Sequence, residues 1–190
     1  MNSRPLWFGT LAAAVFSAGC ATTPSVTSTQ PPASSPAQEA PKRAGTQLES
    51  RSGSSVTGTA RFAQTEQGVE AQIEVSGASE GKRGLHLHEK GDCSAADASS
   101  AGPHWNPAGE SHGDLHAPSH HAGDLGNITI DAEGKGQVRV TNPSWSIGPV
   151  EGKHDILGRA VVVHGAEDDL QSQPAGNAGP RQACGVIEAE

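Results

Sequence analysis

The stretch Gly84-Leu85-His86-Leu87-His88-Glu89 alternates apolar side chains with histidines, which is the pattern of a β-strand. Because successive side chains of a strand point to opposite faces, His86 and His88 would share one face and Leu85 and Leu87 the other. Two imidazoles on one face can bind one metal ion, although a His-x-His pair alone often marks only a solvated strand face. Other metal-binding residue types further along the chain strengthen the interpretation of this pair as metal ligands: His104, His112, His121, Asp124 and His164.

Short alternating runs of this kind recur through the second part of the chain, with no helical pattern of useful length among them. The runs cover residues 56–63, 69–76, 84–89, 127–131, 137–141, 159–164 and 184–188. Glycine and proline separate them, as in residues 132–136. Aromatic residues make up 3% of the chain, so the core must consist mainly of Val, Ile, Leu and Ala. These patterns predict an all-β domain, either an antiparallel sandwich or a barrel.

The segment 101–124 has no strand pattern but is rich in histidine, glycine and proline. A loop of this length inside a compact domain needs something to order it. Metal binding by His104, His112, His121 and Asp124 would supply that order, and three imidazoles with one carboxylate match a closed tetrahedral zinc site. The alternative is a mobile histidine-rich loop that sequesters metal loosely.

The first residues of the chain do not resemble part of a folded domain. Arg4 precedes an apolar stretch, residues 6–18, that is too short to span a bilayer and leads through small residues to Cys20. Residues 17–20 resemble a bacterial lipobox, in which the cysteine carries lipid, except that Ser17 stands where leucine is usual. We therefore predict a signal peptide of lipoprotein type over residues 1–19, lipidation of Cys20, and export to the periplasm or cell envelope. The alternative, a buried N-terminal helix, has no helical partner downstream.

Residues 20–55 are dominated by Pro, Ser, Thr, Ala and Gln, with almost no large apolar side chain. Such a segment cannot bury enough surface to offset the entropy of ordering it. We expect a flexible linker between the lipid anchor and a single domain over residues 56–190; an adhesive or O-glycosylated stalk is the alternative.

The three cysteines are Cys20, Cys93 and Cys184. If Cys20 carries lipid, the other two form an even pair in an oxidising compartment, where disulfides persist. Free buried thiols are the alternative. The bridge would tie the middle of the chain to its C-terminal end.

The segment from about residue 56 to residue 190 resembles the copper–zinc superoxide dismutases that bacteria export. The resemblance rests on six blocks, in the order of that family: GLHLHEKGDC (84–93), SAGPHWNP (100–107), HAGDLGN (121–127), GRAVVVH (158–164), AEDDL (166–170) and GNAGPRQACG (176–185). It implies an eight-stranded Greek-key β-barrel with long metal-binding loops.

By matching position, the resemblance also implies a role for each site residue. The copper ligands would be His86, His88, His104 and His164. The zinc ligands would be His104, His112, His121 and Asp124, so that His104 bridges one copper ion and one zinc ion per chain. The remaining assignments are Asp168 as the carboxylate linking a copper ligand to a zinc ligand, Arg181 as the cation at the copper face, and Cys93–Cys184 as the disulfide.

The implied activity is dismutation of superoxide to dioxygen and hydrogen peroxide by alternate reduction and reoxidation of copper, with zinc structuring the site and His104 passing a proton to the peroxide. Such an enzyme would protect the cell envelope from superoxide. A non-catalytic envelope lipoprotein that binds copper and zinc, and a structural or adhesive lipoprotein, are the alternatives. Copper-carrying relatives that lack activity typically lose ligands or the arginine, whereas this chain keeps all seven ligands and Arg181. A structural or adhesive role leaves the complete copper set unexplained.

Three histidines, His116, His120 and His154, do not match the ligand pattern. His120 adjoins His121, and a slip of one residue would exchange their roles. The spacing from His112 and the following residues 122–124 favour His121 as the ligand. The formal net charge is −8, so we expect no nucleic-acid partner, and any attraction of superoxide must be local. The short stretch 171–176 carries no charge, which leaves Arg181, and then Lys90, Lys153 or another cation, to attract the substrate. The sequence leaves open whether the domain is a monomer or a homodimer.

Overall fold

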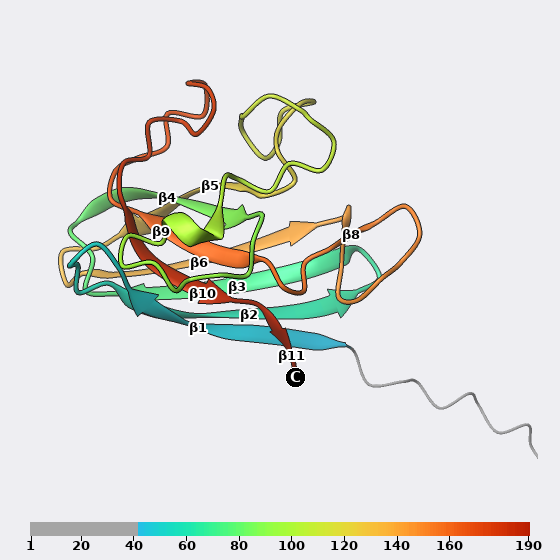
Figure 1. The fold of residues 1–190 in the computed structure, drawn as a ribbon, viewed down its shortest axis with the longest axis horizontal. Helices are drawn as coiled ribbons and strands as arrows, with labels where there is room; N and C mark the ends of the chain where they lie inside the picture. Colours follow the sequence, from blue (N-terminus) through green and yellow to red (C-terminus); the bar gives the residue numbers. More distant parts are fainter. Residues whose placement is uncertain (1–41) are drawn as a thin grey trace, which may run out of the picture. The chain divides into compact units, whose positions relative to one another are not determined.

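The computed structural model describes residues 42–190, and these are almost entirely β-structure (Figure 1). The strands are β1 (Arg43–Ser50), β2 (Thr57–Thr65), β3 (Gly68–Ser76), β4 (Gly81–His88), β5 (Asp124–Ile130), β6 (Lys135–Asn142), β7 (Trp145–Ser146), β8 (His154–Asp155), β9 (Ala160–His164), β10 (Arg181–Val186) and β11 (Glu188–Ala189). Within residues 42–190 the one helix is a single 3₁₀ turn, η1 (Ser99–Ala101), and no helix there is long and apolar enough to cross a membrane. The all-β prediction is confirmed.

Eight of the strands close into an antiparallel barrel in the order β1-β2-β3-β6-β5-β4-β9-β10, and β10 pairs with β1 to complete the ring. The order β9-β4-β5-β6 is a Greek key, because β9 follows β6 along the chain yet lies beside β4. β11 adds to β1, while β7 and β8 form a separate parallel pair. The predicted eight-stranded Greek-key barrel is therefore confirmed.

Alternation along β3 illustrates how the barrel is filled. Its Val69, Ala71, Ile73 and Val75 are at most 2% exposed, whereas the residues between them face outward. Fully burying a valine or isoleucine of this kind contributes about 1.5–3 kcal/mol. Strand β9 differs, since all its residues are buried.

Both faces of β9 are covered because the chain around η1 packs over its outer side. Val161 and Val163 belong to the barrel core, whereas Val162 packs in a second cluster with Ala98 and Cys184. The predicted disulfide is present between Cys93 and Cys184, with their Cα atoms 5.8 Å apart. It joins the segment after β4 to β10.

The barrel begins at Arg43, so the predicted start of the domain at residue 56 is wrong, and β1 lies in what the sequence indicated as linker. The strand has only two buried apolar side chains, Ala44 and Leu48, among polar residues that face solvent. Two such residues are too few to distinguish a strand from a polar linker by composition. The predicted signal segment, Cys20 and the rest of the linker up to residue 41 lie outside the described residues.

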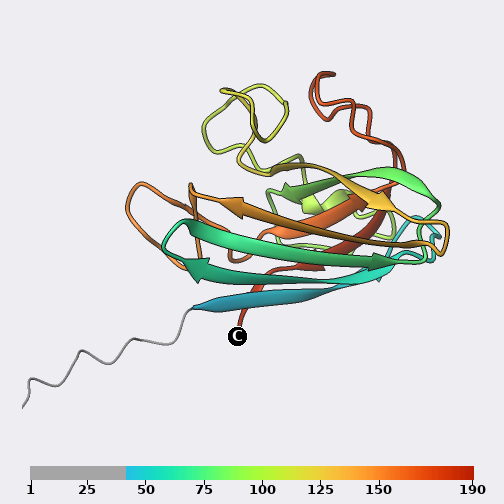
Figure 2. The ribbon, with the colours of Figure 1, turned by 180° about the vertical axis from the view of Figure 1, so that it is seen from behind.

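Two long loops rise from the same edge of the barrel (Figures 1 and 2). One spans residues 105–123 and leads into β5; the other spans residues 165–180 and joins β9 to β10. A hydrogen bond of 2.9 Å from the His112 backbone N–H to Gln173 Oε1 connects them. Together they cover the ends of β4 and β9, where the candidate metal ligands lie.

Candidate metal centre

The pairing of β4 with β9 brings together three of the four predicted copper ligands, His86, His88 and His164. His86 and His88 lie two residues apart on β4 and share a face, as predicted, and both are 0% exposed. His164 ends the neighbouring strand β9, and His104 forms an isolated bridge with His88. One ring nitrogen from each of these four histidines lies within 4.8 Å of all the others.

The hydrogen bonds of His88 and His164 establish which of their nitrogens is free. His88 Nδ1 donates to the carbonyl of Gly102 at 2.9 Å, and His164 Nδ1 donates to the carbonyl of Gly179 at 3.2 Å. A neutral imidazole has one N–H, so the Nε2 atom of each ring carries a lone pair. These two lone pairs face each other at 3.4 Å, a contact that makes sense if a cation lies between them.

His86 also has one hydrogen-bonded and one free ring nitrogen, but its free atom is Nδ1 and not Nε2. Its Nε2 donates to Asp168 Oδ2 at 2.8 Å, which leaves Nδ1 buried without a hydrogen-bond partner. His104 likewise has an unpartnered buried Nε2 atom. The copper set thus offers four imidazole nitrogens aimed at one point, the donor type that copper accepts.

The second set, His104, His112, His121 and Asp124, also converges within 4.8 Å. Asp124 Oδ1 lies 2.9 Å from His104 Nδ1, 3.0 Å from His112 Nδ1 and 3.3 Å from His121 Nδ1. The other carboxylate oxygen accepts the backbone N–H groups of Gly113 (3.1 Å) and His121 (2.9 Å). Nδ1 of both His112 and His121 is buried without a hydrogen-bond partner, which fits three nitrogens and one oxygen around a zinc ion.

His104 belongs to both sets and has one nitrogen in each. Its Nδ1 faces Asp124, and its Nε2 is the unpartnered atom beside the copper ligands. Its ring centroid lies 3.9 Å from that of His86 and 5.6 Å from that of His121. The two predicted ligand sets are therefore adjacent and joined through one ring.

Burial keeps the copper-side rings neutral. It lowers the pKa of His86 to about 4, of His164 to about 3 and of His88 to about 2. A neutral imidazole is the form that binds a metal, so these rings are ready to bind copper near pH 7.

In the zinc set, the carboxylates of Asp124 and Asp168 shift the pKa of His112. Burial lowers the pKa of His112, but hydrogen bonding and charge attraction from Asp124 and Asp168 outweigh it and raise that pKa to about 9. Burial raises the pKa of Asp124, yet the surrounding histidines hold it well below its usual range. A metal that binds His112 must therefore displace a proton.

Asp168 connects the two sets, as the sequence indicated. Its Oδ2 accepts from His86 and its Oδ1 from His112 Nε2, at 2.8 and 2.9 Å. Both bonds leave Nδ1 of the histidine free for metal. Sequence reasoning missed the support of Asp168 itself: Asn127 Oδ1 accepts its N–H at 2.8 Å and Asn127 Nδ2 donates to its carbonyl at 2.9 Å.

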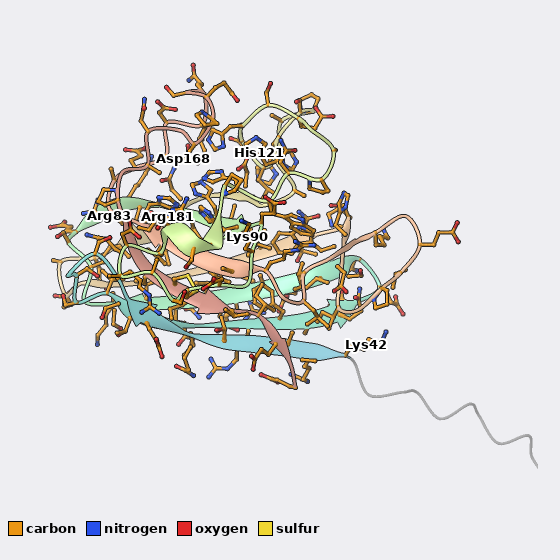
Figure 3. The ribbon with its side chains drawn as sticks, in the orientation of Figure 1. Lys42, Arg83, Lys90, His121, Asp168 and Arg181 are labelled. Carbon is orange, nitrogen blue, oxygen red and sulfur yellow. A yellow bond between two sulfur atoms is a disulfide. The ribbon has the colours of Figure 1, made fainter. Side chains whose placement is uncertain are left out.

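A cavity of about 810 Å³ opens onto the copper side. Its lining includes four ligand histidines, two arginines and one acid: His88, His104, His121, His164, Arg159, Arg181 and Glu89. Arg181 is half-buried and donates from both terminal nitrogens at 2.7 Å, to the carbonyls of Ala98 and Gly102. Figure 3 shows Arg181 at the base of the two long loops, with Asp168 and His121 above it.

Arg159 is the second cation of the cavity, and sequence reasoning missed it. Its guanidinium lies 4.8 Å from the centroid of Trp105 and donates to the carbonyl of Glu89 at 2.6 Å. Lys90 and Lys153, named as alternatives from the sequence, are not among the lining residues; Lys153 Nζ donates to Pro143 instead. The position of Arg159 directly before a buried strand gave no sign of this role.

The non-ligand histidines lie as the sequence indicated. Neither of the two converging sets includes His116, His120 or His154. His120 Nδ1 donates to the carbonyl of His121 at 2.8 Å. The adjacent residue, His121, faces Asp124, so the spacing argument for His121 agrees with the geometry.

Fold and site together define a class: a Greek-key β-barrel metalloprotein with two adjacent ligand sets that share one histidine, beside a cationic cavity. Comparison with known proteins narrows the class. The family model described as copper/zinc superoxide dismutase (SODC) matches residues 56–187. The chain belongs to the copper/zinc superoxide dismutase family.

Individual relatives agree with this placement. The chain is 43% identical to the superoxide dismutase (Cu-Zn) of Neurospora crassa and 41% to that of Schizosaccharomyces pombe, in each case over 72% of this chain and 92% of the relative. It is 41% identical to the superoxide dismutase (Cu-Zn) of Deinococcus radiodurans, over 70% of this chain and 78% of the relative. The crystal structure of the clock protein EA4 is similar at a TM-score of 0.68 and 36% identity, covering 77% of this chain and 94% of that one.

Proposed function

We propose that this copper–zinc superoxide dismutase is exported and held at the bacterial cell envelope by lipid on Cys20, where it removes superoxide. The observation that carries the enzymatic part is the complete donor set: seven ligands in two groups joined by His104, with Arg181 at the cavity beside them. The activity is conversion of superoxide to dioxygen and hydrogen peroxide. The apolar stretch before Cys20 and the linker after it support the envelope location.

The protein supplies position, charge and protons for this reaction. His86, His88, His104 and His164 would hold copper, which would supply the one-electron chemistry by alternating between two oxidation states, whereas zinc has no redox chemistry and would order the loops. His104 Nε2 is the ring atom positioned to carry a proton to the product, while its Nδ1 stays beside Asp124. Asp168 keeps the rings of His86 and His112 in the required orientation.

The net charge of −8 repels an anionic substrate such as superoxide, so attraction must come from positive charge at the cavity. The cavity is lined by two arginines against one carboxylate, Glu89, which forms no ion pair within the described part of the chain. A concave, partly desolvated site focuses such a field and raises the local concentration of a small anion. Arg181 and Arg159 therefore fulfil the role that the uncharged stretch 171–176 cannot.

Replacing Arg181 with alanine is expected to lower kcat/KM for superoxide by about tenfold or more, since local electrostatic focusing is worth 10–10³ in association rate. Copper content should change little because Arg181 is not a ligand, and the dependence of rate on salt should weaken. Stopped-flow rates at several ionic strengths, with metal analysis of the same samples, provide the measurement. Arg61→Ala removes the same charge from an exposed position on β2 and serves as control. Equal losses of rate and copper would overturn this role.

Metal analysis of the mature exported protein tests the catalytic part of the proposal. We expect one copper and one zinc per chain, with activity lost when copper is removed and regained when it is restored. Protein that binds both metals fully without dismutating superoxide would instead be the non-catalytic metal-binding lipoprotein.

Location and assembly need separate experiments. A lipid-anchored protein partitions with membranes, and Cys20→Ala should release active enzyme into the soluble periplasmic fraction. Membrane association that persists in Cys20→Ala would contradict the anchor. The sedimentation coefficient of the mature chain distinguishes a monomer from a homodimer, the two assemblies that the sequence leaves open.

A further inference from the structure

The loop between β9 and β10 contacts the zinc-binding loop through one uncharged side chain, Gln173. Gln173 Oε1 accepts the backbone N–H of His112, and Gln173 Nε2 donates to the carbonyl of the same residue, both at 2.9 Å. The amide thus satisfies both backbone polar groups of a zinc ligand, as a neighbouring strand would. The side chain reaches across 61 residues of sequence to do so.

The loop is organised to present this amide. Asp169 Oδ1 accepts the N–H groups of Gln171 at 3.0 Å and Ser172 at 2.8 Å, and Asp169 N–H donates to the carbonyl of Gly176 at 2.9 Å. Hydrogen bonds from the side chain and backbone of Ser172 and from the backbone of Gln171 lower the pKa of Asp169 to about 2, so its carboxylate is ionised near pH 7. Asn177 closes the turn by donating to Asp169 Oδ2 at 3.0 Å. The loop is therefore ordered by its own hydrogen bonds.

The same loop lies directly against the hydrogen bond between His112 and Asp168. A Cβ at Gly176 would overlap Asp168 Oδ1 and lie 2.6 Å from His112 Nε2. Gly176 also has φ +60°, where a side chain is strained, so both contact and conformation require glycine here. The loop thus encloses the atoms that orient His112.

Both partners of that hydrogen bond are held at the backbone by an amide from elsewhere in the chain. Asn127 makes two bonds to the backbone of Asp168, and Gln173 makes two to the backbone of His112. With backbone and Nε2 both held, the His112 ring has little freedom to turn Nδ1 away from Asp124. Loss of the Asn127 amide would free the backbone of Asp168, and loss of the Gln173 amide would free the backbone of His112.

We infer that Gln173 is a positioning residue of the zinc site, which fastens the zinc-binding loop to the β9–β10 loop by its two-bond contact with His112. In this chain the β9–β10 loop holds zinc in place, whereas substrate attraction belongs to Arg181 and Arg159. Partners that orient a ligand in this way are typically worth 10–100-fold in metal affinity. The inference rests on zinc occupying the set His104, His112, His121 and Asp124.

The test compares Gln173→Leu with Gln171→Leu in the copper- and zinc-loaded enzyme. Gln171 is exposed in the same loop, and its side chain makes no hydrogen bond within residues 42–190, so it is a matched control. Transfer of zinc to a colorimetric chelator measures affinity and dissociation rate. We expect Gln173→Leu to bind zinc about tenfold or more weakly, and Gln171→Leu to match the unmodified enzyme.

A second readout separates positioning from general stability. Cobalt(II) placed in the zinc site reports ligand geometry through its visible absorption, which should change in Gln173→Leu and not in Gln171→Leu. Equal zinc affinities and cobalt spectra in both variants would overturn the inference while leaving the proposed function intact. Failure of the unmodified enzyme to bind zinc at all would overturn both.

Discussion

Replacing His164 with alanine is expected to reduce superoxide dismutase activity at least about a thousandfold, equivalent to about 4 kcal/mol of transition-state stabilisation. His164 contributes one of four converging nitrogens, and its Nε2 is 3.4 Å from that of His88. Without it the copper set keeps three donors, so copper is held more weakly and in a different geometry. Zinc should stay bound, because His164 belongs to the copper set alone.

The measurement pairs activity with copper and zinc content for each variant. His116→Ala is the matched control, since His116 is exposed and outside both ligand sets. It should retain the activity and both metals of the unmodified protein. If His164→Ala kept full copper and full activity, the copper assignment would be wrong; if it lost zinc to the same extent, the two sets would not be separable as described.

Removing the disulfide by the double substitution Cys93→Ser and Cys184→Ser is expected to cost about 2–5 kcal/mol of unfolding free energy. The bridge spans 91 residues of sequence, and Cys184 is 1% exposed between β9 and β1. Freeing Cys93 enlarges the set of unfolded conformations and loosens the covering segment around η1 in the native state. Guanidinium denaturation of the metal-loaded protein measures the change.

The same double substitution should also lower kcat/KM, which links stability to function. The segment tied down by Cys93 contains Ala98 and Gly102, whose carbonyls accept from Arg181, and the Gly102 carbonyl also accepts from His88 Nδ1. Chemical reduction of the unmodified protein should reproduce both losses. Reduced stability with an unchanged rate would show that the segment keeps Arg181 in place without the bridge.

Predictions from the sequence succeeded where the deciding chemistry lies within a short stretch. The alternation in residues 84–89 correctly placed His86 and His88 on one face, and spacing correctly favoured His121 over His120. The sequence-based prediction missed β1, because a strand in which only Ala44 and Leu48 are buried is polar enough to resemble a linker. Its place in the barrel depends on pairing with β2 and β10, which no local pattern records.

Residue types and their spacing alone predicted the all-β class, a zinc-binding set of His104, His112, His121 and Asp124, and two cysteines available to pair, because metal preference follows from the chemistry of the donor atoms. The copper set was predicted from the resemblance of the sequence to a known family. The tertiary structure decided which nitrogen of each ring is free. That depends on the partner of the other nitrogen: Gly102 for His88, Gly179 for His164 and Asp168 for His86. The roles of Arg159 and Gln173 likewise arise from contacts between segments distant in sequence. Such contacts exist only once the barrel has closed.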